Sequence, residues 1–157
     1  MNEILPPRIR PSFEDIFMAF AQLLSERSTC RRASVGCVIA SLDFRQVYSI
    51  GYNGNARGGP NDCDRIGEQA IGNCGCIHAE ANAVVNCTTS RESTKIVLVT
   101  TLPCVACAKM MINMGGVVRV IYKTAYRSTE SIEWLKRADI EVEYHSPCSC
   151  FEFEPSP

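Results

Sequence analysis

The chain has 157 residues, of which 46% are hydrophobic and 21% charged, a balance that suits one compact domain. Its 16 basic and 17 acidic side chains give a formal charge of −1, which leaves no excess of positive charge for binding a nucleic-acid backbone. No apolar run approaches the roughly 18 residues needed to cross a membrane, so we expect one domain over residues 1–157, with a core from about 10 to 146 and a loosely held tail over 147–157.

The first half of the chain predicts one helix and a hairpin. A helix is expected at Phe13–Ser25, where apolar residues recur at helical spacing and Ser12 with Asp15 forms a capping box. Two short apolar segments, Val35–Ala40 and Gln46–Tyr52, flank a charged turn and are typical of an antiparallel pair of strands. A loop rich in Gly, Asn and Asp follows over residues 55–76, and a loop of this length inside a compact domain is usually functional or held by a ligand.

The second half alternates helices and strands. Helices are expected at Ile77–Asn86, Pro103–Met114 and Ser128–Arg137, and strands at Lys95–Thr101, Val117–Tyr122 and Ile140–Tyr144. Strands joined through helices imply right-handed crossovers and parallel neighbours. The predicted fold class is therefore α/β, a three-layer α/β/α sandwich in which a mixed five-stranded sheet carries helices on both faces.

Ten cysteines are many for a chain of this size. The first twelve residues contain three prolines and lack the apolar stretch of an export signal, which argues against a secreted disulfide scaffold. We expect a reduced, cytoplasmic chain whose cysteines are partly core residues and partly metal ligands.

Two motifs at predicted helix starts carry the strongest chemical signal. One is His78-Ala79-Glu80 and the other is Pro103-Cys104-Val105-Ala106-Cys107, directly after a buried strand. Cys104 and Cys107 fall on one side of a first helical turn, where Pro103 sacrifices no needed N–H and the positive end of the helix favours thiolates. With His78 as the third ligand, a zinc ion keeps its fourth position open for water, which is the arrangement of a catalytic site.

Glu80 decides what such a site does. Zinc lowers the pKa of a bound water from about 16 to roughly 7 and so supplies hydroxide at neutral pH. A carboxylate beside that water would accept its proton, deliver it to a ring nitrogen and help protonate the departing ammonia. A purely structural zinc site has no reason to place Glu80 there. The combined H-x-E and P-C-x-x-C pattern is typical of nucleobase deaminases.

The sequence resembles the cytidine/deoxycytidylate deaminase superfamily, and within it the deoxycytidylate deaminases, from about Phe13 to Tyr144. The matching segments are Arg27-Ser28-Thr29-Cys30, Val35-Gly36-Cys37-Val38-Ile39, Gly51-Tyr52-Asn53-Gly54, His78-Ala79-Glu80-Ala81-Asn82-Ala83 and Pro103-Cys104-Val105-Ala106-Cys107-Ala108. The resemblance implies hydrolysis of dCMP to dUMP and ammonia, which supplies dUMP for thymidylate synthesis. It also implies a homo-oligomer, commonly a hexamer, and control by dCTP and dTTP as effectors with Mg²⁺.

The same resemblance implies substrate contacts. Asn53 should hydrogen-bond the sugar or base, and the Ala79 backbone N–H should meet the base O2. Arg27 and Ser28 are the candidates for the 5′-phosphate, and a guanidinium such as that of Arg27 fits phosphate bidentately. Tyr126 falls where relatives place an aromatic side chain near the base, with a surface position as the alternative.

Some relatives hold the long loop with a second, structural zinc. Here Cys30, Cys63, Cys74 and Cys76 would be its ligands. Such a metal would explain why so long a loop is tolerated, and four free thiols are the alternative.

Three other functions stay open at this point. Deaminases of dCTP or of another cytosine or guanine nucleotide share the zinc triad, and tRNA adenosine deaminases also carry the HAE and PCxxCA motifs, although the neutral charge and the Gly51-Tyr52-Asn53-Gly54 turn argue against tRNA. A zinc-stabilised binding protein without chemistry is the alternative from a different class.

Overall fold

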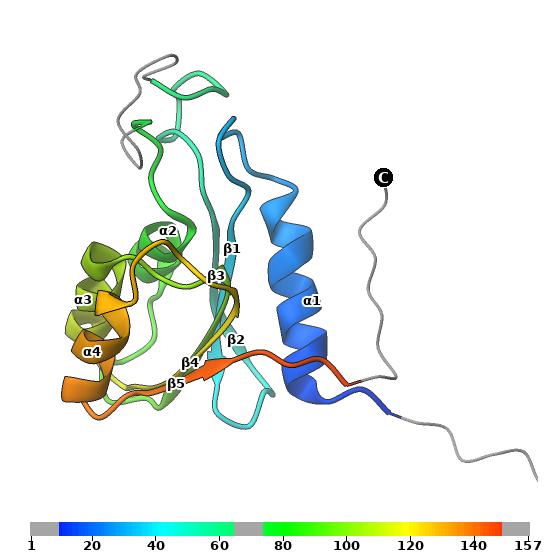
Figure 1. The fold of residues 1–157 in the computed structure, drawn as a ribbon, viewed down its shortest axis with the longest axis vertical. Helices are drawn as coiled ribbons and strands as arrows, with labels where there is room; N and C mark the ends of the chain where they lie inside the picture. Colours follow the sequence, from blue (N-terminus) through cyan, green and yellow to red (C-terminus); the bar gives the residue numbers. More distant parts are fainter. Residues whose placement is uncertain (1–9, 65–73, 149–157) are drawn as a thin grey trace, which may run out of the picture.

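The computed structural model describes residues 10–64 and 74–148, and a five-stranded sheet runs through its centre (Figure 1). The strands are β1 (Gly36–Ser41), β2 (Val47–Tyr52), β3 (Lys95–Thr101), β4 (Val117–Thr124) and β5 (Glu141–Tyr144), in the spatial order β2-β1-β3-β4-β5. Strand β1 pairs antiparallel with β2 and with β3, whereas β3, β4 and β5 are parallel. The predicted hairpin and mixed sheet are confirmed.

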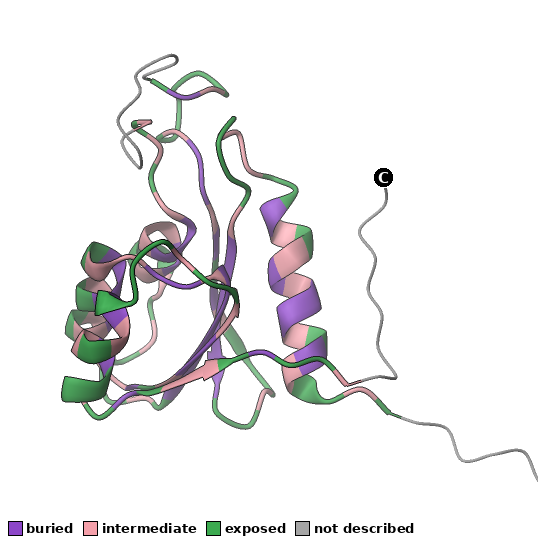
Figure 2. Cartoon of the chain, viewed as in Figure 1, coloured by how far each residue is buried: buried purple, intermediate pink, exposed green. Residues whose placement is uncertain are grey.

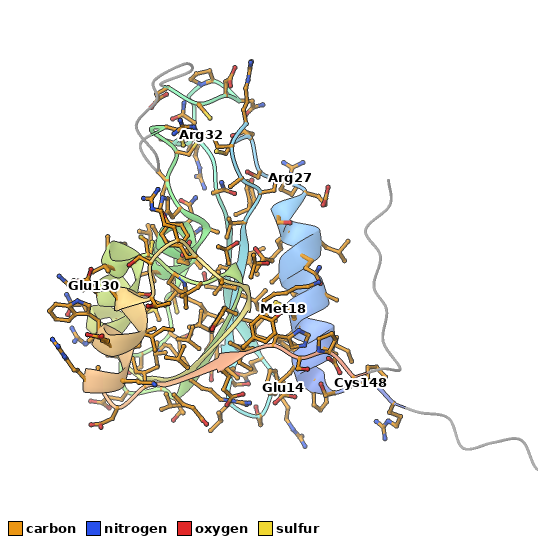
Figure 3. The ribbon with its side chains drawn as sticks, in the orientation of Figure 1. Glu14, Met18, Arg27, Arg32, Glu130 and Cys148 are labelled. Atoms are coloured by element: carbon orange, nitrogen blue, oxygen red, sulfur yellow. The ribbon has the colours of Figure 1, made fainter. Side chains whose placement is uncertain are left out.

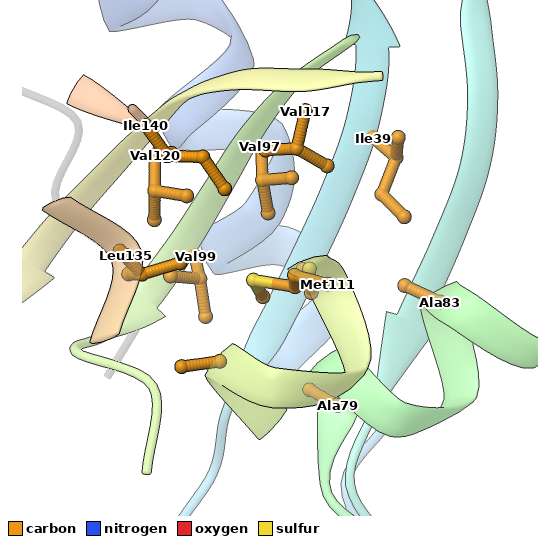
Figure 4. Close-up of a cluster of buried hydrophobic side chains, with 12 residues drawn as sticks. Ile39, Ala79, Ala83, Val97, Val99, Met111, Val117, Val120, Leu135 and Ile140 are labelled. Carbon is orange, nitrogen blue, oxygen red and sulfur yellow. The ribbon is translucent and has the colours of Figure 1, made fainter. Parts of the chain in front are cut away.

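Helices cover both faces of this sheet. Helix α1 (Phe13–Ser25) lies on one face, and α2 (Ala79–Asn86), α3 (Val105–Met114) and α4 (Glu130–Arg137) lie on the other (Figure 1). Alternate residues of the inner strands supply two apolar layers, because successive side chains of a strand point to opposite faces. Val38 and Leu98 pack with Met18 of α1, whereas Ile39 and Val97 share a cluster with Met111 of α3 (Figures 2 and 4).

The start of α1 also holds the end of the described chain. The predicted capping box is present: the Asp15 N–H donates to Ser12 Oγ, and the Ser12 N–H donates to Asp15 Oδ2, each at 3.0 Å. His145 Nε2 lies 3.0 Å from Asp15 Oδ1, and the Cys148 N–H donates to the same oxygen at 3.4 Å (Figure 3 labels Cys148). Burial acts to raise the pKa of Asp15, but these hydrogen bonds outweigh it and the pKa is lowered. The first residues of the predicted tail are therefore attached to α1, and residues 149–157 lie outside the described residues.

Two helix boundaries differ from the prediction in a way that matters. Helix α2 begins at Ala79 and α3 at Val105, so each starts two residues later than expected. His78 and Cys104 are N-cap residues with extended backbones, and Pro103 lies outside the helix altogether, so its expected place in the first turn is wrong. The other boundaries that differ do so by one or two residues, the usual ambiguity of element ends.

Helix α2 is pressed unusually close to β2. Ser49 Oγ donates to the Ala83 carbonyl at 2.6 Å, and Asn82 Nδ2 donates to the Tyr52 carbonyl at 2.9 Å. A Cβ atom at Gly51 would lie only 2.1 Å from the Ala79 carbonyl oxygen, so only glycine allows this approach. In the described ranges, no helix is both long and apolar enough to span a bilayer.

Substituting Gly51 tests whether this contact positions the first turn of α2. Gly51→Ala is expected to force α2 away from β2 and to destabilise the fold by about 1–3 kcal/mol, as overpacking does in tight cores. Ile50→Ala is the control, because Ile50 is on the same strand but 39% exposed. Thermal and urea unfolding measure the difference, and equal stability of the two variants would contradict the tight fit.

Candidate metal and active site

Three predicted ligands meet at the beginnings of two helices. His78 Nδ1 lies 3.5 Å from Cys104 Sγ and 3.5 Å from Cys107 Sγ. All three ligand atoms lie within 4.8 Å of one another. The sequence places these residues 26 and 29 positions apart, so the meeting depends on the packing of α2 against α3 and not on local spacing.

The N-cap position explains how the side chains become available. The His78 and Cys104 carbonyls accept the first helical hydrogen bonds, from Asn82 at 3.0 Å and Ala108 at 2.9 Å. Neither side chain caps its own helix. Each is directed instead into the space where the two positive helix ends converge, which stabilises negative charge there.

The charges of this trio are arranged for metal binding. Hydrogen bonds from Cys107 and His78 lower the pKa of Cys104 to about 3, and the neighbouring Cys104 raises the pKa of Cys107. The interaction with Cys104 also raises the pKa of His78. The lowered pKa favours the thiolate form of Cys104 at neutral pH, and a divalent cation bound there would favour the thiolate form of Cys107 as well.

The donor set fits zinc. Bonds of about 2.3 Å to sulfur and about 2.0 Å to nitrogen at tetrahedral angles place sulfur and nitrogen ligands roughly 3.5 Å apart, and sulfur ligands roughly 3.8 Å apart. The two sulfur–nitrogen distances of 3.5 Å match this spacing. Three protein ligands leave one tetrahedral position for a further ligand, which is typical of a catalytic zinc site and not of a structural one.

Glu80 lies beside this trio in the first turn of α2. Its side chain is only 4% exposed, and burial raises its pKa to about 7. A hydrogen bond with Cys107 and the charge of His78 both act to lower the pKa of Glu80, but burial outweighs them. A buried carboxyl group with this pKa can both accept and return a proton near neutral pH.

A cavity of about 490 Å³ is lined by His78 and Cys104 of the trio and by Glu80. Its lining includes the predicted substrate residues Asn53, Ala79 and Tyr126. Ala79 is the first residue of α2, where a backbone N–H has no partner within the helix. Asn53 Nδ2 donates to the Ala33 carbonyl at 2.7 Å and its Oδ1 accepts from the Val35 N–H at 2.8 Å, so it also shapes the loop before β1.

The two predicted phosphate residues lie elsewhere. Arg27 is at the end of α1 (Figure 3) and lines a second cavity, of about 590 Å³, where its guanidinium is 5.8 Å from the centre of the Tyr52 ring. Ser28 Oγ donates to the Ala33 carbonyl at 3.3 Å and accepts from the Cys30 N–H at 3.2 Å. The cations that line the cavity beside the trio are Arg32 and Arg127, which no sequence motif singled out.

A second cluster of sulfur atoms adjoins the same cavity, which Cys30, Cys74 and Cys76 help to line. Cys30 Sγ lies 3.7 Å from the sulfur of Cys74 and 3.7 Å from that of Cys63, and Cys76 Sγ lies 3.6 Å from Cys63 Sγ. All four atoms are within 4.8 Å of one another. Residues 65–73 of the intervening loop lie outside the described residues. The geometry thus brings together the four cysteines named from the sequence.

The remaining described cysteines are distinct from both clusters. Cys37 is fully buried in the core, where burial raises its pKa well above the usual value, and Cys87 is half-buried beside the same core. Cys148 is in a disulfide bond, which corrects the expectation of a fully reduced chain.

The chain is similar to known proteins in sequence. The family model for the cytidine and deoxycytidylate deaminase zinc-binding region matches residues 11–124. A deoxycytidylate deaminase of Schizosaccharomyces pombe is 31% identical over 153 residues, which are 90% of this chain and 47% of that protein. One of Mycobacterium phage D29 is 33% identical over 125 residues, 72% of this chain and 95% of that protein. The chain thus spans about half the length of the yeast relatives that it matches.

A solved structure agrees in fold and in sequence. The crystal structure of a dCMP deaminase from the cyanophage S-TIM5 in complex with dCMP and dUMP superposes with a TM-score of 0.75 and 32% identity. The match covers 88% of this chain and 100% of the cyanophage chain.

Removing one ligand of the trio tests its role in metal binding. His78→Ala and Cys107→Ser are each expected to weaken zinc binding at least roughly 100-fold and to lower the bound zinc by one equivalent per chain, because two ligands cannot replace three. Cys87→Ser is the matched control. Metal analysis after dialysis against a weak chelator measures the change, and an unchanged zinc content would exclude the trio as the site.

Proposed function

The chain belongs to the cytidine and deoxycytidylate deaminase family, and we propose that it catalyses the zinc-dependent hydrolysis of dCMP to dUMP and ammonia. The observation that carries this proposal is the position of a buried carboxyl group, Glu80, beside a three-ligand trio in one cavity. A structural zinc site would have a fourth protein ligand in place of the open position. Neither a structural site nor a simple binding pocket would need a buried carboxyl group beside the metal.

His78, Cys104 and Cys107 would hold the zinc. Bound there, zinc supplies an acidified water and so a nucleophile at neutral pH. The Glu80 carboxylate takes the proton of the attacking water and passes it to the ring nitrogen next to the reacting carbon. Glu80 then takes the remaining proton from the hydroxyl group added to the reacting carbon and transfers it to the amino group, so that the carbon–nitrogen bond breaks, ammonia leaves and the base keeps the oxygen as a carbonyl.

Residues around the trio would hold the base in line with this chemistry. The Ala79 N–H has no partner within α2 and can donate to the base O2, as expected from the sequence. Tyr126 and Leu102 line the same cavity and exclude water from the base. Asn53 fixes the Ala33–Val35 loop through both ends of its amide, and its remaining hydrogen-bonding capacity faces the nucleoside.

A pyrimidine nucleotide is supported as the substrate by the relatives. The S. pombe and phage D29 proteins are deoxycytidylate deaminases, and the cyanophage structure binds dCMP and dUMP. A homohexamer, control by dCTP and dTTP with Mg²⁺, and a cytoplasmic location stay predictions from the resemblance. Light scattering and assays with each effector test the first two.

We also propose a second, structural zinc bound by Cys30, Cys63, Cys74 and Cys76. The three sulfur–sulfur distances, 3.7, 3.7 and 3.6 Å, agree with the roughly 3.8 Å expected between sulfur ligands of one tetrahedral zinc. Backbone N–H groups support the sulfurs as well: that of Arg31 donates to Cys63 Sγ at 3.4 Å and that of Arg32 to Cys30 Sγ at 3.5 Å. Four protein ligands close the coordination sphere, so this site would hold the loop and do no chemistry.

A substrate panel tests the reaction directly. Ammonia release is measured with dCMP, dCTP, deoxycytidine, guanine and tRNA, and dCMP is expected to be the preferred substrate. Turnover of tRNA or guanine without turnover of dCMP would overturn the proposal. Absence of turnover by zinc-loaded chain with every substrate would favour a zinc-stabilised binding protein.

Glu80→Gln separates catalysis from metal binding. The amide keeps the size of the side chain but cannot shuttle protons, so kcat is expected to fall by about 100- to 10,000-fold. Zinc content and melting temperature should stay within error of the wild type. Glu92→Gln changes an exposed carboxylate and is the control. Equal activity of the two variants would remove Glu80 from the reaction.

Cys63→Ser tests the structural zinc, because Cys63 does not line the cavity. The variant is expected to lose one zinc equivalent per chain, and its melting temperature should fall by at least about 5 °C as the loop loses its cross-link. Cys87→Ser is again the control. A wild-type chain that holds only one zinc, with an unchanged melting temperature in the variant, would mean that the four thiols are free.

A further inference from the structure

We propose that the C-terminal segment of the chain, residues 149–157, packs in an extended conformation on the outer side of helix α1. This contact is on the opposite side of the sheet from the metal trio (Figure 1), and it does not depend on the proposed reaction.

Helix α1 carries apolar side chains on two opposite sides. Met18 and Ala21 are fully buried against the sheet. A second set recurs at intervals of three and four residues and so shares the opposite side, which we call the outer stripe: Phe13, Ile16, Phe20 and Leu23. A helix that lies on a sheet ordinarily presents polar residues to water on that side, so the outer stripe needs a partner.

The outer stripe is exposed in the described part of the chain. Phe13, Ile16 and Leu23 are 55%, 43% and 53% exposed, and Phe20 is half-buried. Phe13 stacks on Phe44, with ring centroids 5.8 Å apart, and still keeps more than half of its surface accessible. No other described helix shares this face of the sheet with α1 (Figure 1).

The described chain ends beside this stripe. Asp15, one residue before Ile16, accepts from the Cys148 N–H at 3.4 Å and lies 3.0 Å from His145 Nε2. Asp15 and His145 are both buried, so this attachment is part of the fold and not a surface contact. Residue 149 therefore follows from a point that is fixed at the N-terminal end of α1.

The length of the remaining chain fits the helix. Leu23 lies eight residues beyond Asp15, which is about 12 Å along the helix axis at about 1.5 Å per residue. Phe151 and Phe153 follow Cys148 by three and five residues, and an extended chain spans about 10 and 17 Å over these intervals. Both rings can therefore reach the outer stripe.

The sequence of the segment fits the same surface. Phe151-Glu152-Phe153-Glu154 alternates aromatic and acidic residues. Successive side chains of an extended chain point to opposite sides, so the two rings share one side and the two carboxylates share the other. The rings would face the outer stripe while the carboxylates stay in water. Pro155 and Pro157 disfavour a helix and keep the segment extended.

Charge at the far end of α1 supports the same direction. Arg27 follows Leu23 by four residues and is exposed. It lies about 18 Å beyond Asp15 along the axis, and Glu154, six residues beyond Cys148, reaches about 20 Å. A segment that runs along α1 from its start thus brings Glu154 to a cation.

A double-mutant cycle tests the contact in the full chain. Phe153→Ala is expected to lower the folding equilibrium constant by roughly 5- to 30-fold, because a ring that is covered in the native state is lost. In a Leu23→Ala background the same change should have an effect of less than about threefold, since its partner is already absent. Val85→Ala is the matched control background, because Val85 is 76% exposed on α2, and it should leave the effect of Phe153→Ala unchanged. Urea unfolding measures all four equilibria.

Photo-cross-linking locates the segment without relying on stability. Benzoylphenylalanine is placed at position 153 in a mixture of unlabelled and ¹⁵N-labelled chains, which is then irradiated and digested. Mass spectrometry is expected to find the cross-link on residues 13–27, within chains of one isotope. The same probe at position 85 is the control and should not label α1.

Three results would overturn the proposal. They are an undiminished effect of Phe153→Ala in the Leu23→Ala background, cross-links to an element other than α1, and cross-links between unlabelled and labelled chains, which would make a second copy of the chain the partner. None of these measurements needs turnover. A wild-type chain that fails to deaminate dCMP would therefore overturn the proposed function and leave this contact to be decided by its own test.

Discussion

The convergence of two helix N-termini is the constraint on which the site depends. His78 and Cys104 occupy N-cap positions, where serine, threonine, aspartate or asparagine would ordinarily satisfy the first backbone N–H groups. Neither side chain does so. Both helices therefore give up a stabilising cap, usually worth about 1 kcal/mol, and retain an unsatisfied positive end. The positive helix ends are important for the trio, because their electrostatic field favours thiolate over thiol. A bound zinc would recover more free energy than the two caps would supply.

The sheet holds these two helix ends in place from behind. Helix α3 follows β3 directly and packs on the core through Met111, while α2 is fixed to β2 by Gly51, Ser49 and Asn82. Because β2 and β3 both pair with β1, the two helices inherit a fixed separation from the sheet. The distance between His78 and Cys104 is thus determined by the spacing of the strands and not by the loop that precedes His78.

Local patterns in the sequence predict most of the fold but not the encounters between distant segments. Lys95–Thr101 is confirmed residue for residue, because a short run of β-branched and apolar residues between polar turns has few other solutions. The starts of α2 and α3 are missed by two residues, because ligand residues stand where ordinary caps would mark the boundary. The motif identifies the four residues of the metal and active site, His78, Glu80, Cys104 and Cys107. The sequence does not predict that Arg27 lines another cavity or that Arg127 lines the one beside the trio. These placements depend on how the loops leave the sheet, which the periodicity of the sequence does not encode.

The two sulfur clusters impose opposite electrostatic demands on one cavity. Zinc held by two thiolates and an imidazole is electrically neutral, so the trio neither attracts nor repels a phosphate strongly. Zinc held by four thiolates carries two net negative charges and, as a wall of the same cavity, would repel one. The Arg31 side chain pairs with Asp62, so the cations left to offset that repulsion are those lining the cavity. Arg32 and Arg127 both line this cavity and supply that positive charge, and the Arg32 N–H lies against the sulfur of Cys30.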